Sequence, residues 1–239
     1  MYIGSVSTKG LNHLIYEIVD NAVDEHLAGF CKNIHVTLEK DGSATVEDDG
    51  RGVPVGMHQK GISAARLVYT TLHAGGKFDD SAYKTSGGLH GVGSSVVNAL
   101  SVYMDVQISR EGYIHHDRYE RGVPVVELED GLLPTIGKTR KTGTKVNFLP
   151  DDTIFEKTKF RAEEVKSRLH ETAYLNPELT IVFDDKRPDS QEHIEYHEPD
   201  GILGFIRDLN QKKGSASRSD LLQGNSRRNR SRSGISVCQ

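Results

Sequence analysis

Residues 10–28, GLNHLIYEIVDNAVDEHLA, hold the pattern from which the rest of the fold is predicted. Apolar residues recur here at steps of three and four, as on the buried face of an amphipathic helix: Leu11, Leu14, Ile15, Ile18, Ala22 and Val23. Polar residues repeat every four positions and form a second stripe: His13, Glu17, Asn21 and Glu25. A base, an amide and two carboxylates in one stripe suit an active-site wall, but such stripes are also the ordinary solvent face of a helix.

The bulk composition is that of a soluble globular protein. The chain has 239 residues, enough for one large domain or two small ones, with 36% hydrophobic and 27% charged residues. No apolar run approaches the roughly 20 residues of a membrane helix, and the N-terminus lacks the features of a signal peptide. Two cysteines, Cys31 and Cys238, cannot build a disulfide framework, and no Cys/His spacing indicates zinc. We therefore expect a reduced, cytoplasmic protein.

The charge is distributed unevenly along the chain. The net charge is −4, although the segment from Gly214 onward carries five arginines against one aspartate. The remaining body is therefore acidic, which argues against a domain that grips DNA by itself. The segment 214–239 is rich in Ser, Arg and Asn and has no apolar period, so we expect it to be disordered. A short basic arm that binds nucleic-acid phosphates is the alternative.

Periodicity and turn signals predict the order of the elements. We expect helices at 10–28, 62–73, 94–100, 160–175 and 200–211, and strands at 33–40, 44–47, 102–110, 113–120, 144–149, 179–184 and 193–197. This order of helix, hairpin, helix, loop, helix and strand-rich stretch favours an α+β fold over a doubly wound parallel sheet. The expected architecture is a two-layer sandwich, in which helices cover one face of a mixed, mostly antiparallel sheet.

A glycine-broken loop follows the second strand of the predicted hairpin. Asp48 stands at the end of this strand, and Gly50 and Gly52 follow it. A carboxylate at a strand end can accept a hydrogen bond from an exocyclic amine such as that of adenine, and glycines let the backbone approach a flat ring closely. The same string is also typical of a common glycine turn with surface acids.

A long loop at 74–93, AGGKFDDSAYKTSGGLHGVG, has almost no apolar anchor. Loops of this length in compact domains are usually functional or disordered. Its glycines at 87–93 lead into the helix expected from Ser94, so successive N–H groups and the helix start can cradle a polyphosphate. The string is neither a Walker A loop nor a Rossmann turn, because it lacks Gly-Lys-Ser/Thr and no strand leads directly into it. Lys77 and Lys84 can add positive charge; the alternative is a flexible surface loop.

These pieces together resemble one superfamily. Glu17 with Asn21, Asp48-x-Gly50-x-Gly52, the glycine loop 87–93 and Thr144 are similar to the four sequence boxes of the gyrase, Hsp90, histidine-kinase and MutL ATPases. Within about residues 1–213, longer strings resemble the ATPase subunits of bacterial type II topoisomerases, gyrase and topoisomerase IV: EIVDNAVDEHLAG, EDDGRGVPVGMH, LHAGGKFDD and YKTSGGLHGVGSSVVNALS. The resemblance implies a Bergerat-type ATP-binding fold, with ATP and Mg²⁺ as cofactors, that couples ATP hydrolysis to DNA strand passage and supercoiling.

The resemblance also implies roles for single residues. Glu17 would be the general base that activates the attacking water, His13 would orient Glu17, and Asn21 would bind Mg²⁺. Further residues would surround the adenine through hydrogen bonds, an ion pair or apolar packing: Glu25, Val46, Asp48, Arg51, Gly52, Val53, Pro54, Thr144 and Val146. A last group would close over the triphosphate: Lys77, Tyr83, Lys84, Gly88, Leu89, His90, Gly91, Val92 and Gly93.

Partners and departures follow from the same resemblance. The full-length enzyme would act on DNA with a gyrase A-type subunit, would form a homodimer through the ATPase domain when its N-terminal arm is present, and would need no membrane. We expect residues 1–213 to be an ATPase domain without that arm. The transducer domain, whose lysine reaches the γ-phosphate, is expected to be missing, and 214–239 to be an aberrant tail from a shifted reading frame. His116 stands where many gyrases carry an arginine that contacts coumarin drugs.

Other functions stay open at this point. A truncated ATP-binding module with little or no turnover would keep the pocket but lose hydrolysis. A histidine kinase would need a phosphoacceptor helical hairpin ahead of residue 10, for which the sequence shows no room. A nucleic-acid binder acting through 214–239 would show salt-sensitive DNA binding that is lost when this tail is deleted.

Overall fold

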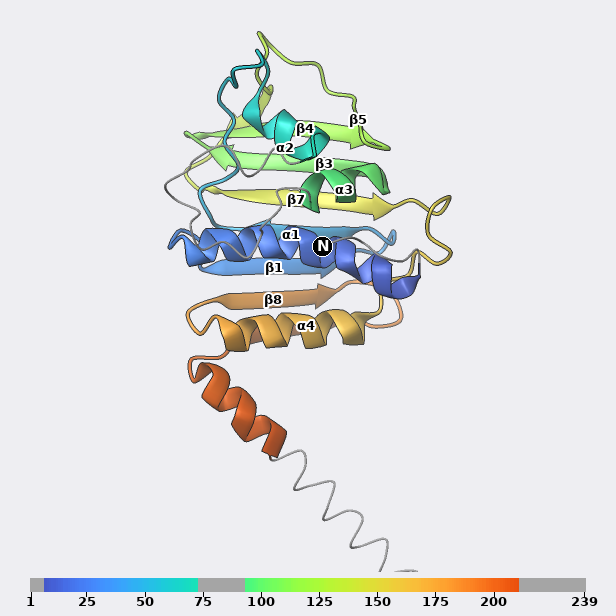
Figure 1. Ribbon diagram of the computed structural model, residues 1–239, viewed down its shortest axis with the longest axis vertical. Coiled ribbons are helices and arrows are strands. Elements are labelled where there is room, and N and C mark those ends of the chain that lie inside the picture. Colours follow the sequence, from blue (N-terminus) through green and yellow to red (C-terminus); the bar gives the residue numbers. More distant parts are fainter. Residues whose placement is uncertain (1–6, 73–92, 211–239) are drawn as a thin grey trace, which may run out of the picture.

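A twenty-residue helix, α1 (Thr8–Leu27), lies across the middle of the sheet in the computed structural model, which describes residues 7–72 and 93–210 (Figure 1). Its predicted apolar face is buried, and Leu11, Leu14 and Ile15 are completely inaccessible to solvent. The helix ends at Leu27, followed by Ala28 and Gly29, close to the expected boundary. Periodicity therefore predicted the central helix correctly.

The remaining elements are short helices and the strands of one sheet. The strands are β1 (Asn33–Leu38), β2 (Ala44–Asp48), β3 (Ser101–Arg110), β4 (Tyr113–Glu120), β5 (Val123–Pro124), β6 (Thr135–Lys138), β7 (Gly143–Pro150), β8 (Thr180–Asp185) and β9 (Glu192–His197). The other helices are α2 (Ala64–Thr70), α3 (Gly93–Ala99) and α4 (Ala162–Leu175), and residues 201–210 are also helical.

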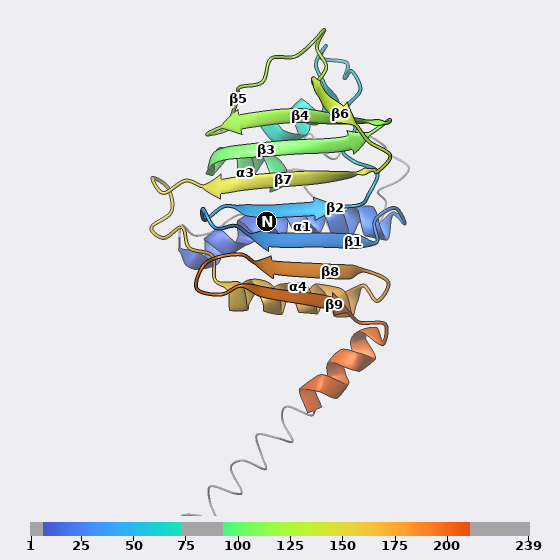
Figure 2. The same cartoon turned by 180° about the vertical axis from the view of Figure 1, so that it is seen from behind.

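The nine strands form one sheet in the order β5-β4-β3-β7-β2-β1-β8-β9, with β6 paired to β4. Every pairing is antiparallel except that of β1 with β8. The four helices α1 to α4 lie on one face of this sheet (Figure 1), and the strands face the viewer when the molecule is turned round (Figure 2). The expected α+β, two-layer sandwich with a mixed, mostly antiparallel sheet is therefore confirmed.

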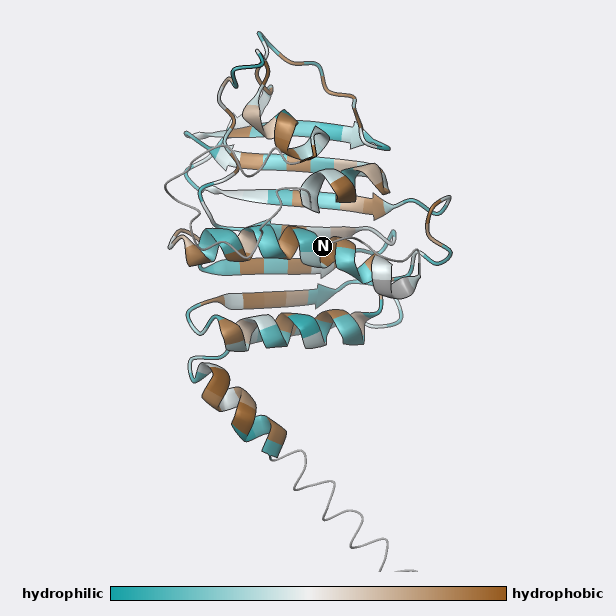
Figure 3. Ribbon diagram, in the orientation of Figure 1, coloured by the Kyte–Doolittle hydropathy of each residue, from teal (hydrophilic) through white to brown (hydrophobic). Residues whose placement is uncertain are grey.

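The core lies between the helices and the inward side chains of the central strands. Val46 on β2 is the register partner of Val146 on β7, which is in turn the partner of Val106 on β3. All three side chains are buried, as period-two alternation requires of a half-covered sheet. The alternation of hydrophilic and hydrophobic residues along the strands is visible in Figure 3.

Several predicted boundaries were wrong. Helix α2 begins at Ala64 rather than at residue 62, because Ser63 forms an isolated bridge with Met57. Helix α4 begins at Ala162 rather than at Phe160, whose ring packs edge-on against Phe148 in the core at 6.2 Å. Strands β5 and β6 were not predicted, since two and four residues are too few for a periodic signal. The predictions for 74–92 and for the tail 214–239 lie outside the described residues.

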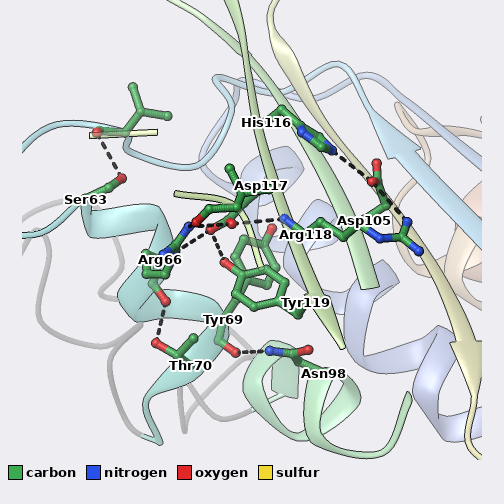
Figure 4. Close-up of polar contacts among 12 residues, drawn as sticks. Ser63, Arg66, Tyr69, Thr70, Asn98, Asp105, His116, Asp117, Arg118 and Tyr119 are labelled. Atoms are coloured by element: carbon green, nitrogen blue, oxygen red, sulfur yellow. Dashed lines mark hydrogen bonds and ion pairs between the residues drawn. The ribbon is translucent and has the colours of Figure 1, made fainter. Parts of the chain in front are cut away.

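A buried ion pair fastens α2 to the sheet (Figure 4). Arg66 donates from Nε and Nη2 to the two carboxylate oxygens of Asp117 on β4, both at 2.8 Å, and from Nη2 to the Val126 carbonyl at 2.7 Å. The Tyr119 hydroxyl donates to the same carboxylate. Both charges are almost fully buried, so each depends on the other for compensation.

The helix at 201–210 extends beyond the β9 edge and is coloured mainly hydrophobic in Figure 3. Ile202, Leu203, Ile206 and Leu209 are all exposed on it. Over residues 7–72 and 93–210, no helix combines the length and the apolar character that crossing a membrane requires.

Candidate active site

The polar stripe of α1 meets the start of α3. Glu17 lies against Gly93, the first residue of α3: a Cβ atom built on this glycine would be only 2.4 Å from Glu17 Oε2. Only a residue without a side chain leaves room for the carboxylate here. Burial, and then the neighbouring charge of Asp20, raise the pKa of Glu17. A carboxylate with a raised pKa in a half-buried position is suited to accept a proton.

Asn21 lies one turn further along α1 and contacts the next residue of α3. Its Nδ2 donates to Ser94 Oγ at 2.9 Å. The Asn21 side chain is exposed, whereas Ser94 is buried. Two successive residues of α3 therefore contact two successive turns of the stripe.

Glu25, the last member of the stripe, is paired with Arg51. Arg51 donates from Nε to Glu25 Oε2 at 3.0 Å and from Nη2 to Oε1 at 2.8 Å, and its backbone N–H also donates to Oε2. The guanidinium lies 3.9 Å from the centre of the Phe30 ring. Because this bidentate pair is stacked on an aromatic face, it fixes the loop after β2 against the end of α1.

Asp48 and Asp49 have different surroundings, although they are adjacent in the chain. Asp49 accepts three hydrogen bonds from Lys32 N, Asn33 N and Asn33 Nδ2, and thereby holds the start of β1. Asp48 Oδ1 accepts from Gly50 N at 2.8 Å and from Thr144 N at 3.4 Å. Among the described residues, nothing donates to Asp48 Oδ2. Asp49 is therefore structural, and Asp48 keeps an oxygen for a ligand.

The charge on Asp48 is held in an unfavourable position. Burial, only partly offset by the two N–H donors, raises the pKa of Asp48 to about 6. Behind it, Gly143 packs so closely that a Cβ atom there would be 2.0 Å from the Asp48 carbonyl oxygen. The start of β7 therefore presses directly on the end of β2, and this contact brings Thr144 to the carboxylate.

The loop after Asp48 is fixed from two sides. Thr144 Oγ1 accepts a hydrogen bond from Val53 N at 3.2 Å, and Arg110 Nη1 donates to the Gly52 carbonyl at 2.6 Å. Val53 is partly buried against the core, which also contains Val46 and Val146. Pro54 is exposed beside this loop. The site thus combines an apolar floor with an acceptor at its edge, as ligand pockets commonly do.

The other predicted site residues are less closely joined. His13 lies on α1 with its ring edge-on to Tyr16, and its contact with Glu17 stays a prediction. Lys77, Tyr83, Lys84 and 88–92 lie outside the described residues. His116 is on β4 and forms a hydrogen bond through Nε2 with Asp105 Oδ2 at 2.8 Å, as Figure 4 shows.

The residues fit a cation that is held mainly by a ligand rather than by the protein. In the described part of the chain, no three His, Cys, Asp or Glu side chains are grouped to hold a metal. The Asn21 amide oxygen next to the Glu17 carboxylate is an oxygen donor of the kind Mg²⁺ takes when substrate phosphates complete its shell.

The structure adds three residues that the sequence did not single out. Asp20 raises the pKa of Glu17, Ser94 contacts Asn21, and Arg110 holds the Gly52 carbonyl. The first was detectable, since a helix brings side chains three residues apart together. The other two depend on contacts between distant segments.

A helical wall, an acceptor at a strand end and a glycine at the start of a second helix, all on one face of a mixed sheet, define a nucleotide-binding ATPase fold. The family model described as "Histidine kinase-, DNA gyrase B-, and HSP90-like ATPase" matches residues 7–154, and the chain belongs to this family.

Individual relatives are components of type II topoisomerases. The chain is 51% identical over 213 residues to the DNA gyrase B protein of Archaeoglobus fulgidus and 52% identical over 214 residues to the DNA topoisomerase 4 B protein of Streptococcus pneumoniae. These alignments cover 89% of this chain but 33% and 32% of the relatives, so the chain spans about one third of their length.

A solved structure agrees with this assignment. The fold is similar to that of the 43K ATPase domain of Thermus thermophilus gyrase B in complex with an aminocoumarin, with a TM-score of 0.74 and 39% identity. The comparison covers 87% of this chain and 52% of that one.

Proposed function

We propose that this chain binds and hydrolyses ATP as the ATPase domain of a type II DNA topoisomerase. The observation that carries the proposal is the Glu17 carboxylate, half-buried and of raised pKa, packed against Gly93 at the start of α3. The glycine loop that ends at Gly93 would bring the triphosphate to this carboxylate. The similarity to gyrase and topoisomerase IV proteins supports the same reaction.

The chemistry is phosphoryl transfer to water. Glu17 would accept a proton as the water oxygen forms its bond to the γ-phosphorus, and the bond from this phosphorus to the ADP oxygen breaks. His13 would orient Glu17, and Lys77, Tyr83, Lys84 and the backbone of 88–93 would close over the phosphates. Positioning and charge compensation account for most of the catalysis in such reactions.

The adenine would be recognised at the end of β2. Asp48 Oδ2 would accept a hydrogen from the exocyclic amine, Gly52 and Thr144 would hold the surrounding network, and the pair of Glu25 and Arg51 would line its edge with Pro54 nearby. The valines of β2 and β7 would form the floor.

A bound Mg²⁺ would neutralise negative charge on the phosphate oxygens. Asn21 is the residue that would hold it, through its amide oxygen.

The larger assembly is part of the proposal. The domain, taken as residues 1–213, would act in the cytoplasm with DNA and a gyrase A-type subunit, and would dimerise through its own fold. Identities of 51% and 52% do not separate gyrase from topoisomerase IV, so the proposal covers both.

The test combines ATP binding by calorimetry in Mg²⁺ with steady-state hydrolysis on the same preparation. The wild-type chain should bind and turn over ATP. Glu17→Ala and Glu17→Gln should abolish hydrolysis and keep most of the binding, because the base acts on water rather than on the nucleotide.

Glu171→Gln, which alters an exposed carboxylate on α4, is the matched control and should leave both quantities unchanged. Wild-type turnover in a Glu17 variant would overturn the assignment of the base. Binding without turnover in the wild type would identify a binding module, and no binding would overturn the proposal itself.

A further inference from the structure

The beginning of α3 supplies more than the end of a glycine loop. Gly93 makes room for the Glu17 carboxylate, and Ser94, the next residue, contacts the amide of Asn21 at 2.9 Å. Glu17 and Asn21 are four residues apart on α1, so both side chains emerge on the same side. The short helix therefore contacts the two α1 side chains with chemical roles through two consecutive residues.

The contact with Ser94 selects one orientation of the Asn21 amide. An asparagine amide has one end that donates two hydrogens and one end that accepts. In the structure the donating end, Nδ2, faces Ser94 Oγ, so Oδ1 faces away from it. Within residues 7–72 and 93–210, nothing donates to this oxygen. The amide thus presents an acceptor where a rotation by half a turn would present hydrogens.

The two partners differ in freedom. Asn21 is exposed and would sample several rotamers by itself, whereas Ser94 is only 7% exposed and is carried by a helix packed on α1. A fixed acceptor opposite a mobile amide lowers the entropy that must be lost when the amide binds a ligand. Partners of this kind commonly orient the first ligands of a metal.

We propose that Ser94 is a positioning residue for cation binding: by accepting a hydrogen bond from Asn21 Nδ2, it directs Asn21 Oδ1 toward the Mg²⁺ of a bound nucleotide. The inference rests on the proposed ATP-binding function and names the residue that orders its metal ligand. A packing role for Ser94 predicts a different outcome, because loss of packing would weaken all nucleotide binding alike.

The experiment separates the metal-dependent part of the affinity from the rest. The dissociation constant of a non-hydrolysable ATP analogue is measured by calorimetry twice, once in excess Mg²⁺ and once in EDTA, and the ratio of the two values is the gain due to Mg²⁺. Ser94→Val and Ser94→Thr have nearly the same shape and differ in the hydroxyl, so comparing them isolates the hydrogen bond.

Ser94→Val should reduce the gain due to Mg²⁺ by about three- to tenfold, the usual effect of one lost hydrogen bond. Its dissociation constant in EDTA should stay close to that of Ser94→Thr, and the threonine variant should keep most of the wild-type gain. Ser101→Ala is the matched control, since Ser101 Oγ donates to the Val97 carbonyl at the other end of α3. It should leave the gain unchanged.

Thermal unfolding of each variant, followed by circular dichroism, accompanies the titrations. If the valine variant does not fold, Ser94→Ala against Ser94→Thr gives the same comparison. An equal gain in variants with and without the hydroxyl would overturn the role of Ser94 and leave ATP binding intact. A wild-type chain that binds no nucleotide in either buffer would overturn the proposed function and this inference together.

Discussion

Glu17 and Gly93 are so close that a single added methyl group at Gly93 would overlap the carboxylate, at 2.4 Å from Oε2. The clashing atom is the far end of a flexible side chain, so the fold can yield by moving Glu17. The arrangement therefore couples the position of the candidate base to the identity of the first residue of α3.

Gly93→Ala should consequently fold and yet lose activity. Alanine favours a helix over glycine by about 1 kcal/mol, so the melting temperature should not fall. ATP turnover should drop by at least about tenfold, because general-base catalysis depends on the placement of the base. Steady-state hydrolysis and a thermal melt measure both. Gly56→Ala, at a glycine with no atom within 4 Å of the added Cβ, is the control and should change neither.

Asp48 should cost stability at neutral pH. Its folded-state pKa of about 6 lies above that of an unfolded aspartate, so its stabilising contribution is present below the unfolded pKa and is lost as pH rises through the folded one. Asp48→Asn keeps an acceptor for Gly50 and Thr144 but carries no charge. It should raise the free energy of unfolding at pH 7.5 by on the order of 2 kcal/mol, measured by urea denaturation. Asp152→Asn, at an exposed aspartate, should change it little.

The same residue should make ATP affinity depend on pH. As pH falls through about 6, Asp48 gains a proton and Oδ2 loses part of its capacity to accept from the adenine amine. Wild-type affinity should therefore decline between pH 7.5 and pH 5.5, whereas Asp48→Asn should bind more weakly but with a flatter pH profile. Calorimetry across this range measures both. Parallel profiles in the two proteins would contradict the adenine contact.

Arg66 and Asp117 should be strongly coupled in stability. Either Arg66→Met or Asp117→Asn leaves a buried charge without its partner, and each should cost about 3–5 kcal/mol of unfolding free energy. The double variant should cost less than the sum of the two, since neither charge then remains. Urea denaturation of all four proteins completes the cycle. Arg207→Ala, in an exposed pair with Asp200, should cost under about 1 kcal/mol.

Arg110 should affect nucleotide binding without contacting the bound adenine. Its hydrogen bond to the Gly52 carbonyl at 2.6 Å holds the loop that follows Asp48. Arg110→Ala should weaken ATP binding by about three- to tenfold, as expected for one charged hydrogen bond, and Arg110→Lys should recover part of the loss. Arg140→Ala, at an exposed arginine, is the control in the same calorimetric titration.

The sequence predicted local features well and distant contacts poorly. Helix α1 follows from the spacing of its leucines and isoleucines, and the hairpin of β1 and β2 from alternation around Asp41 and Gly42. The close contact of Gly143 with Asp48 could not be predicted, because it depends on β7 pairing with β2, and pairing between distant strands has no local signal. Arg66 was equally hidden, since an arginine is usually exposed and only β4 supplies the carboxylate that allows its burial.

The pairing of β2 with β7 also sets a timetable for synthesis. Asp48 and Thr144 are 96 residues apart, so at about 5–20 residues per second the second half of the adenine corner leaves the ribosome roughly 5–20 seconds after the first. During that interval α1 and the hairpin of β1 and β2 have no nucleotide to stabilise them. ATP could therefore assist the folding of this chain only after β7 has been made.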